Sequence, residues 1–401
     1  MNHQHFFLLL FTTIPIIAKD IAIPAVTIVP VANLATEPLS KRFPRETFPY
    51  EKLPTTYKSK GGIDECPRLH QLIFNERVNI IKKQGNDVMV EVPYLFFQTS
   101  PKGQKINHYW SDARYFMPLK SANRYQHWVP APIDFNQPES VSQSNICTLT
   151  RPFYYCPTDK SYSAGTRFIV SDQDGSALIF DPVEKKVHHA TIPATYCVQN
   201  SQLTTPEQRQ HFFVQLLKQW VHNPHGKIPY VWGGCSHNFQ YPTLNYIVKA
   251  HTYKDKLYFN YCLQGNYPTC DSGFDCTGLI LRAAQIAQIP YFFKNTTTVG
   301  FNLKQLQSNE KIENGDLILF SGHIILISDV DKNLVIEARS KYDDYGYIHE
   351  IPLCQVFRGI ETYADLRKAY ETQEKLERLD AHDKIISHVP IRIMKLNSVW
   401  R

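Results

Sequence analysis

The sequence predicts a multidomain protein in which two small β-barrels precede an α+β domain. Between 63 and 200, short runs of β-forming residues alternate with turns, and from 205 onward a helical pattern is followed by several strands. A chain of 401 residues is also too long for one ordinary domain. With 43% hydrophobic and 20% charged residues, the composition is that of a globular protein and excludes a disordered one.

The first 62 residues are expected to precede the folded domains. An apolar run from 6 to 18 has the length of a signal-peptide core and is too short to span a bilayer. Segment 1–23 is therefore predicted to be a signal peptide or N-terminal anchor, with a buried strand as the alternative. Residues 24–62 are rich in proline and are expected to form an extended leader. We expect an exported protein of the periplasm or cell envelope, with no transmembrane domain beyond this segment.

The β-rich region divides into two stretches, predicted as barrel 1 (63–130) and barrel 2 (131–200). Residues 88–92 alternate between apolar and polar after a turn at 85–87. The runs 166–170 and 177–180 are likewise short, β-like and separated by turns. The α+β domain is expected over 201–401. Its helices are predicted after Thr205, after Cys276 and over 362–380, its strands at 316–320, 323–327, 334–338 and 391–396, and an irregular insert at 235–272.

Cys276 is the principal candidate for chemistry, because it stands at the predicted start of a helix. The positive end of the helix dipole there favours thiolate over thiol, and the thiolate is the nucleophile of cysteine enzymes. Gly273 and Gly278 allow a tight turn beside it. A buried structural cysteine is the alternative.

Three further side chains could complete a thiol-based site. His323 begins a predicted strand and could act as base, or be an ordinary surface histidine. A three-residue loop at 329–331 would place Glu337 opposite His323, where a carboxylate could orient the imidazole. A surface pair of Glu337 with Arg339 is the alternative. Tyr230 could donate to an oxyanion or serve as a packing residue.

The remaining features exclude other classes of function. Cys235, His237, Cys262 and Cys270 do not follow the spacing of a zinc site, so we expect no metal and no cofactor. Of the nine cysteines, eight could pair in an exported protein and leave one free nucleophile. Basic residues are scattered and the net charge is only +6, which argues against nucleic acid and suits an anionic polymer surface.

Five runs in this order resemble the NlpC-type cysteine peptidases of bacterial cell-wall turnover. They are 229–234 (PYVWGG), 274–280 (FDCTGLI), 314–320 (NGDLILF), 322–324 (GHI) and 335–338 (VIEA). The resemblance implies a papain-like α+β fold, with SH3-like barrels preceding it. It also implies hydrolysis of the γ-D-glutamyl–diamino acid amide in peptidoglycan stem peptides, in wall turnover or recycling. We expect a monomer.

By the same resemblance, Cys276, His323 and Glu337 would be catalytic and Tyr230 would contribute to the oxyanion site. Asp275 and Thr277 would anchor the free amino end of the stem, and Tyr115 is the candidate for contact between barrel and substrate. The chain departs from the family pattern twice: Gly234 and Asp275 stand 41 positions apart, and the third catalytic position, usually His, holds Glu337. A non-catalytic peptidoglycan-binding envelope protein and a thiol-dependent acyltransferase are the alternative functions.

Overall fold

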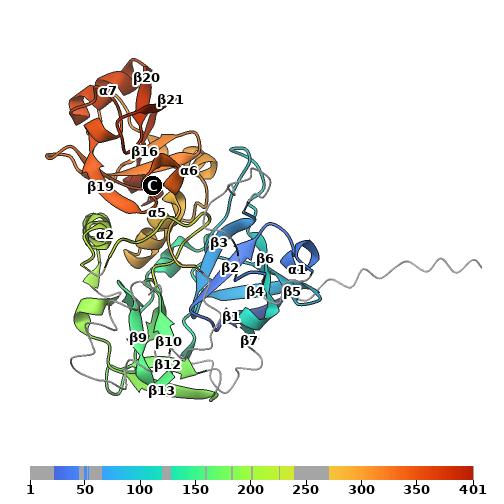
Figure 1. Cartoon of the computed structure of the whole chain (residues 1–401). Helices are drawn as coiled ribbons and strands as arrows, with labels where there is room; N and C mark the ends of the chain where they lie inside the picture. Colours follow the sequence, from blue (N-terminus) through green and yellow to red (C-terminus); the bar gives the residue numbers. More distant parts are fainter. Residues whose placement is uncertain are drawn as a thin grey trace, which may run out of the picture.

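The computed structural model is a multidomain, β-rich protein with few helices (Figure 1). It describes residues 22–44, 49–51, 53, 66–119, 128–158, 160–181, 184–199, 202–224, 226–238 and 271–400. Most of segment 1–23 and nearly all of the 235–272 insert lie outside these residues, so the predictions for them are not addressed. No helix among the described residues is long and apolar enough to cross a membrane.

The N-terminal region folds into one antiparallel sheet of seven strands in the order β3-β2-β6-β5-β4-β1-β7. The strands are β1 (Ile23–Thr27), β2 (Val31–Ala35), β3 (Arg68–Ile73), β4 (Arg77–Gln84), β5 (Asp87–Glu91), β6 (His108–Asp112) and β7 (Phe116–Pro118), with the short helix α1 (Leu39–Arg42). Its inward-facing side chains, such as Leu34, Leu72 and Val90, are fully buried. Burial of these alternate residues fixes which face of the sheet packs inward.

The prediction of an extended leader over 24–62 was wrong for its first part. Strand β1 pairs with β4 and β7, and β2 pairs with β3 and β6. Pro30 lies in the turn between the two strands and Pro38 immediately precedes α1, so these prolines bound the elements without interrupting them. Ala25, Val26 and Leu34 are completely buried, which explains why the segment joins the sheet.

The second β-rich region consists of smaller sheets. Strands β8 (Ile146–Leu149), β11 (Arg167–Ile169) and β14 (Cys197–Gln199) form one sheet, β9 (Phe153–Tyr155) pairs with β10 (Lys160–Tyr162), and β12 (Ala177–Asp181) pairs with β13 (Lys186–Ala190). Phe74, from the end of the first sheet, packs edge-on against Tyr162. The two regions therefore share part of their core. The β-rich prediction is confirmed, whereas the SH3-like barrel topology stays a prediction.

The C-terminal region combines helices with a six-stranded antiparallel sheet in the order β15-β22-β16-β17-β18-β19. Its elements are α2 (Pro206–Val221), α5 (Cys276–Ile286), α6 (Thr296–Asn302), β15 (Lys304–Gln305), β16 (Leu317–Phe320), β17 (His323–Asp329), β18 (Leu334–Ala338), β19 (Ile348–Pro352), α7 (Tyr363–Glu371), β20 (Lys375–Leu379), β21 (Ile385–Pro390) and β22 (Arg392–Lys395). The start of α2 is as predicted, because Thr205 and Gln208 form a reciprocal capping box.

One predicted helix ends earlier than expected. The segment 362–380 is helical only as far as Glu371, and Gln373 has a positive φ of 55° that ends the helical run. Beyond it, β20 pairs with β21 as a separate hairpin. This difference matters because β20 brings Arg378 toward the candidate site.

A set of polar side chains on β3 holds the turn that leads toward Cys276. The Arg68 guanidinium donates to the carbonyl of Trp232, and the Gln71 side-chain oxygen accepts from the N–H of Cys235. Gly233 has a positive φ of 68°, and a Cβ there would lie 2.7 Å from the Arg68 carbonyl oxygen. The turn therefore requires glycine both for its backbone angle and for its close contact with the first sheet.

Helix α5 is tied to both β-rich regions through the buried side chain of Arg282. Its Nη1 donates to Glu76 Oε1 at 2.6 Å, while its Nε donates to the Cys235 carbonyl at 3.0 Å. Its aliphatic stem lies so close to Gly165 that a Cβ there would come within 2.5 Å of the Arg282 Cδ. One cation thus connects the helix with the first sheet, the 233–236 turn and the second region.

We expect Arg282→Met to lower the free energy of unfolding by about 3–5 kcal/mol, because it leaves the buried Glu76 carboxylate without its cation. Urea denaturation followed by circular dichroism measures this loss. The matched control is Lys332→Met, since Lys332 pairs with Asp329 at 3.8 Å while 73% exposed, and should cost less than about 1 kcal/mol. Equal effects of the two substitutions would contradict the role assigned to Arg282.

Candidate active site

Cys276 is the first residue of α5, and its surroundings explain why the chain begins a helix there. Asp275 is the N-cap, and its carboxylate accepts from the N–H of Gly278 at 2.5 Å. A Cβ on Gly278 would collide with the Gly234 carbonyl, so glycine allows the upstream turn to pack directly against the helix. The thiol is half-buried at this junction.

The thiol of Cys276 is predominantly protonated in the resting site. Burial raises its pKa to about 12, and the negative charge of Asp275 acts in the same direction. A hydrogen bond from the Ile324 N–H and the charges of Lys294 and Arg378 oppose this but are outweighed. Desolvation therefore opposes the effect of the helix N-terminus, which the sequence predicts to favour thiolate.

His323 lies at the start of β17, where the preceding Gly322 adopts a positive φ of 77°. The imidazole is buried, and its Nε2 lies 2.7 Å from Glu337 Oε2. Burial and then the positive charge of Arg378 lower the pKa of His323 to about 4, although Glu337 acts in the opposite direction. The imidazole is therefore neutral near pH 7, and with Nε2 engaged by Glu337, Nδ1 is left to act as base.

The backbone connects the thiol with the histidine. The Ile324 N–H that bonds the Cys276 sulfur belongs to the residue directly after His323. Helix α5 also packs against β17, so the start of the helix and the start of the strand meet. The structure thus brings Cys276 and His323 to the same place, as the sequence predicted.

Glu337, on β18, is buried beneath the histidine and has four cationic or polar neighbours. Besides His323, it contacts His349 Nε2 at 3.2 Å, Arg339 Nη1 at 3.5 Å and Arg378 Nη2 at 3.6 Å. Burial disfavours its charge, but hydrogen bonds from the two histidines outweigh this and hold the pKa of Glu337 well below its ordinary value. The alternative of a surface pair with Arg339 does not apply, because both side chains are completely buried.

The predicted register of this hairpin was wrong by two residues. Leu326 pairs with Ile336, and a bulge follows between Ile327 and Asp329, so His323 lies diagonal to Glu337 and not directly opposite. Side chains two residues apart on a strand point to the same face. The error in register therefore left His323 and Glu337 on a common face and within hydrogen-bonding distance.

Tyr230 lies beside the thiol through backbone pairing. It forms a parallel bridge with Phe274, two residues before Cys276. Burial and then the charge of Cys276 raise the pKa of Tyr230 far above its ordinary value, so its hydroxyl keeps its proton. A neutral phenol in electrostatic contact with the thiol is able to donate a hydrogen bond to negative charge that develops there.

Asp275 and Thr277 are brought together but are already engaged. The Thr277 hydroxyl donates to Asp275 Oδ1 at 3.0 Å, and the Lys294 ammonium donates to Asp275 Oδ2 at 3.0 Å. Tyr115 lies elsewhere, completely buried in the first region with its ring edge-on to Tyr50. A fully buried ring offers no surface to a substrate, so the structure does not support the expectation for Tyr115.

Sequence reasoning missed Arg378, His349 and Lys294. Arg378 was missed because we expected a helix over 362–380. The segment instead forms strand β20, and this strand places Arg378 beside Glu337. His349 could have been found from the register, because it pairs directly with Glu337 across β18 and β19. Lys294 carries no motif of its own, and only the return of the chain after α5 brings it to Asp275.

Among the described residues, Cys235 and His237 do not belong to any group of three or more possible metal ligands. Cys235 and His237 are buried, while Cys262 and Cys270 lie outside the described part of the chain. The seven described cysteines all carry free thiols, so none of the expected disulfides joins two of them.

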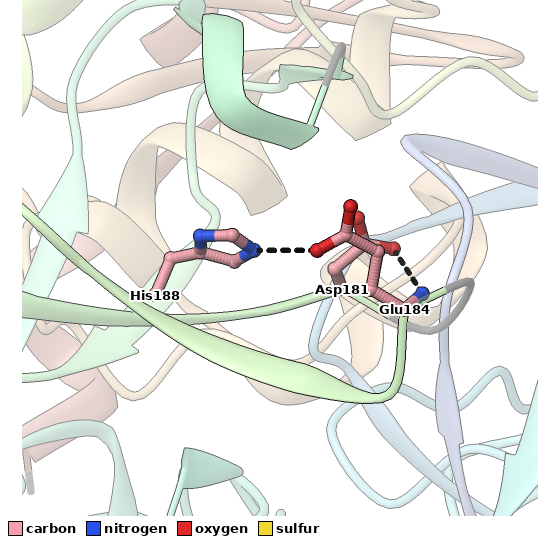
Figure 2. Close-up of side chains that lie close together, drawn as sticks. All are labelled: Asp181, Glu184 and His188. Atoms are coloured by element: carbon pink, nitrogen blue, oxygen red, sulfur yellow. Dashed lines mark hydrogen bonds and ion pairs between the residues drawn. The ribbon is translucent and has the colours of Figure 1, made fainter.

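A separate cluster of possible ligands lies at the β12–β13 hairpin. His188 Nε2 is 3.8 Å from Glu184 Oε2, and the Glu184 N–H donates to Asp181 (Figure 2). The buried Lys160 ammonium lies 3.6 Å from Asp181 Oδ1, and a cation already beside this carboxylate disfavours a metal ion. No metal site is assigned to these residues.

The structural neighbours of this chain include NlpC/P60 proteins. A crystal structure of an NlpC/P60 family protein from Bacillus cereus ATCC 10987 matches with a TM-score of 0.49 and 16% identity, over 82% of this chain and 94% of that one. NlpC2 and NlpC1 from Trichomonas vaginalis match with TM-scores of 0.30 and 0.29 and identities of 11% and 10%; each match covers 83% of this chain and 92% or 89% of the other. No family model and no curated protein sequence matches. Identities and TM-scores this low do not assign an activity or a substrate.

We expect alkylation of Cys276 by iodoacetamide to accelerate by roughly tenfold per pH unit from pH 7 to 10, without a plateau. The reason is that only the thiolate reacts and a pKa of about 12 keeps it a minor species throughout. Peptide mass spectrometry separates Cys276 from the exposed Cys156 in the same sample. A rate that is constant from about pH 5 upward would instead reveal a preformed thiolate–imidazolium pair.

Proposed function

We propose that this chain is an exported cysteine endopeptidase that hydrolyses the γ-D-glutamyl–diamino acid amide of peptidoglycan stem peptides. The observation that carries the proposal is the buried 2.7 Å contact of His323 with Glu337, next to a thiol bonded by the Ile324 N–H. Thiol, base and orienting carboxylate are the groups that acyl transfer through a covalent intermediate requires. The bond, the substrate and the envelope location are supported by the sequence motifs around these residues.

The first chemical step starts from neutral groups. As the Cys276 sulfur attacks the amide carbonyl, its proton passes to His323 Nδ1, which is free to accept because Nε2 faces Glu337. The carboxylate stabilises the imidazolium that forms and holds the ring in one orientation. A proton transfer coupled to attack suits a thiol with a high pKa, because no stable thiolate has to exist beforehand.

Charge that develops on the carbonyl oxygen is met by the Tyr230 hydroxyl and the Cys276 backbone N–H. The N–H groups in the first turn of a helix have no partner within the helix, and Tyr230 retains its proton. His323 then protonates the leaving amine, and water attacks the thioester with His323 again acting as base. The products are a γ-D-glutamyl peptide with a free carboxylate and a peptide that begins with the diamino acid.

Mass spectrometry of muropeptides incubated with the protein tests this proposal. The wild-type protein should split stems between D-glutamate and the diamino acid, and Cys276→Ala should yield no such products, because the nucleophile is absent. Identical product spectra from the two proteins would rule out Cys276 as nucleophile. Retention on isolated sacculi without any product would instead favour a wall-binding protein.

A separate test concerns Tyr230. We expect Tyr230→Phe to lower kcat on the order of a hundredfold while KM changes little, because the hydroxyl acts on charge present only in the transition state. Steady-state kinetics on a fluorogenic γ-glutamyl amide measures both constants. A rise in KM with unchanged kcat would assign Tyr230 to substrate binding and remove it from the oxyanion site.

A further inference from the structure

A small cavity lies where the two β-rich regions meet α5. Its volume is about 20 Å³, and its walls include Asn75 and Arg77 from the first region, Arg167 from β11, and Arg282 and Gln285 from α5. The side chains of Asn75, Arg282 and Gln285 are more than nine-tenths buried. A volume of this size holds one water-sized particle, so polyatomic anions such as sulfate and phosphate do not fit.

Four polar atoms of these lining side chains are buried without a hydrogen-bond partner among the described residues. One is an acceptor and three are donors: Asn75 Oδ1, Arg77 Nε, Arg167 Nη2 and Gln285 Nε2. Other atoms of the same side chains are engaged, since Gln285 Oε1 accepts from Arg282 Nη1 at 3.0 Å and Asn75 Nδ2 donates to the Arg167 carbonyl at 3.0 Å. Leaving buried donors without an acceptor is costly, and the cavity is the space in which an acceptor has room.

The charges around the cavity do not balance. Glu76 supplies the only carboxylate among the lining residues, and it is paired with Arg282 at 2.6 Å. Arg77 and Arg167 each donate to a backbone carbonyl, but neither lies within ion-pair distance of a carboxylate in the described part of the chain. Burial lowers the pKa of Arg167 to about 10, which still leaves it cationic near pH 7. Three guanidinium groups therefore face one carboxylate, and an anion would offset part of this poorly hydrated positive charge.

We propose that this cavity binds one small monovalent anion of the chloride class, held by Arg77, Arg167 and Gln285. A chloride ion is only slightly larger than a water molecule, accepts several hydrogen bonds and offsets one of the excess positive charges. Water would accept from the same donors but would leave the charge unchanged. Because the walls come from both β-rich regions and from α5, the ion completes the junction at Arg282 that positions the start of the helix. This inference does not depend on the proposed function.

Thermal unfolding of the full-length protein in two salts tests the proposal. Sodium chloride is compared with sodium gluconate at equal ionic strength, because the gluconate ion is too large for the cavity. We expect chloride to raise the Tm of the wild type, relative to gluconate, by about 3 °C or more between about 5 and about 500 mM, since a ligand that binds only the folded state stabilises it by mass action. The same Tm in both salts at every concentration overturns the inference.

Gln285→Glu separates binding in the cavity from general effects of salt. The substitution keeps an oxygen for Arg282 and places a carboxylate where the anion binds, so the variant should fold in gluconate and lose the response to chloride. Gln215→Glu adds the same charge at an exposed position on α2 and should keep the full response. If Gln285→Glu does not fold, Arg167→Met removes one donor and one charge and should lose the response as well. A chloride response equal to that of the wild type in the cavity variant overturns the inference.

Long-wavelength anomalous diffraction from wild-type crystals kept in sodium chloride locates the ion directly. Chlorine scatters anomalously at such wavelengths, whereas the oxygen of water does not. We expect an anomalous peak in the cavity, beside Arg77 Nε and Arg167 Nη2, and no peak there in crystals of Gln285→Glu. An ordered water without anomalous signal in the wild-type cavity would identify a hydration site and overturn the inference.

Discussion

The buried guanidinium of Arg282 is the constraint on which the arrangement of this protein depends. It joins α5 to Glu76 in the turn between β3 and β4 and to the carbonyl of Cys235, while the aliphatic stem of Arg282 packs against Gly165. Helix α5 begins with Cys276, so the position of its thiol is fixed by contacts made almost two turns further along. The β-rich regions therefore form part of the framework that holds the thiol.

Charge compensation is the second organising feature. Glu337 lies among His323, His349, Arg339 and Arg378, while Asp275 is paired with Lys294. Burying a carboxylate is tolerated only where cations and hydrogen bonds replace its hydration. These partners come from β17, the residue after β18, β19, β20 and the segment after α5, so distant parts of the C-terminal region supply the cations and hydrogen bonds around the two carboxylates.

Burial is the largest cause of the pKa shifts at the site. Desolvation raises the pKa of Cys276 to about 12 and, together with Arg378, lowers that of His323 to about 4. Both groups are consequently neutral at rest, so in the proposed mechanism charge separation would accompany the attack on substrate. Glu337 and Tyr230 are placed where the two developing charges would appear, one beside the imidazole and one beside the thiol.

The sequence by itself determined the local features: the capped start of α2, the start of α5 near Cys276 and the strands from 316 to 338. Short-range hydrogen bonding and apolar periodicity decide these, and both are visible in the chain. Only the tertiary structure decided that β1 and β2 belong to the first sheet, that β20 places Arg378 beside Glu337, and that the Lys294 ammonium pairs with Asp275. These contacts join segments far apart in the chain. No local sequence pattern therefore specifies which cation will pair with which buried carboxylate.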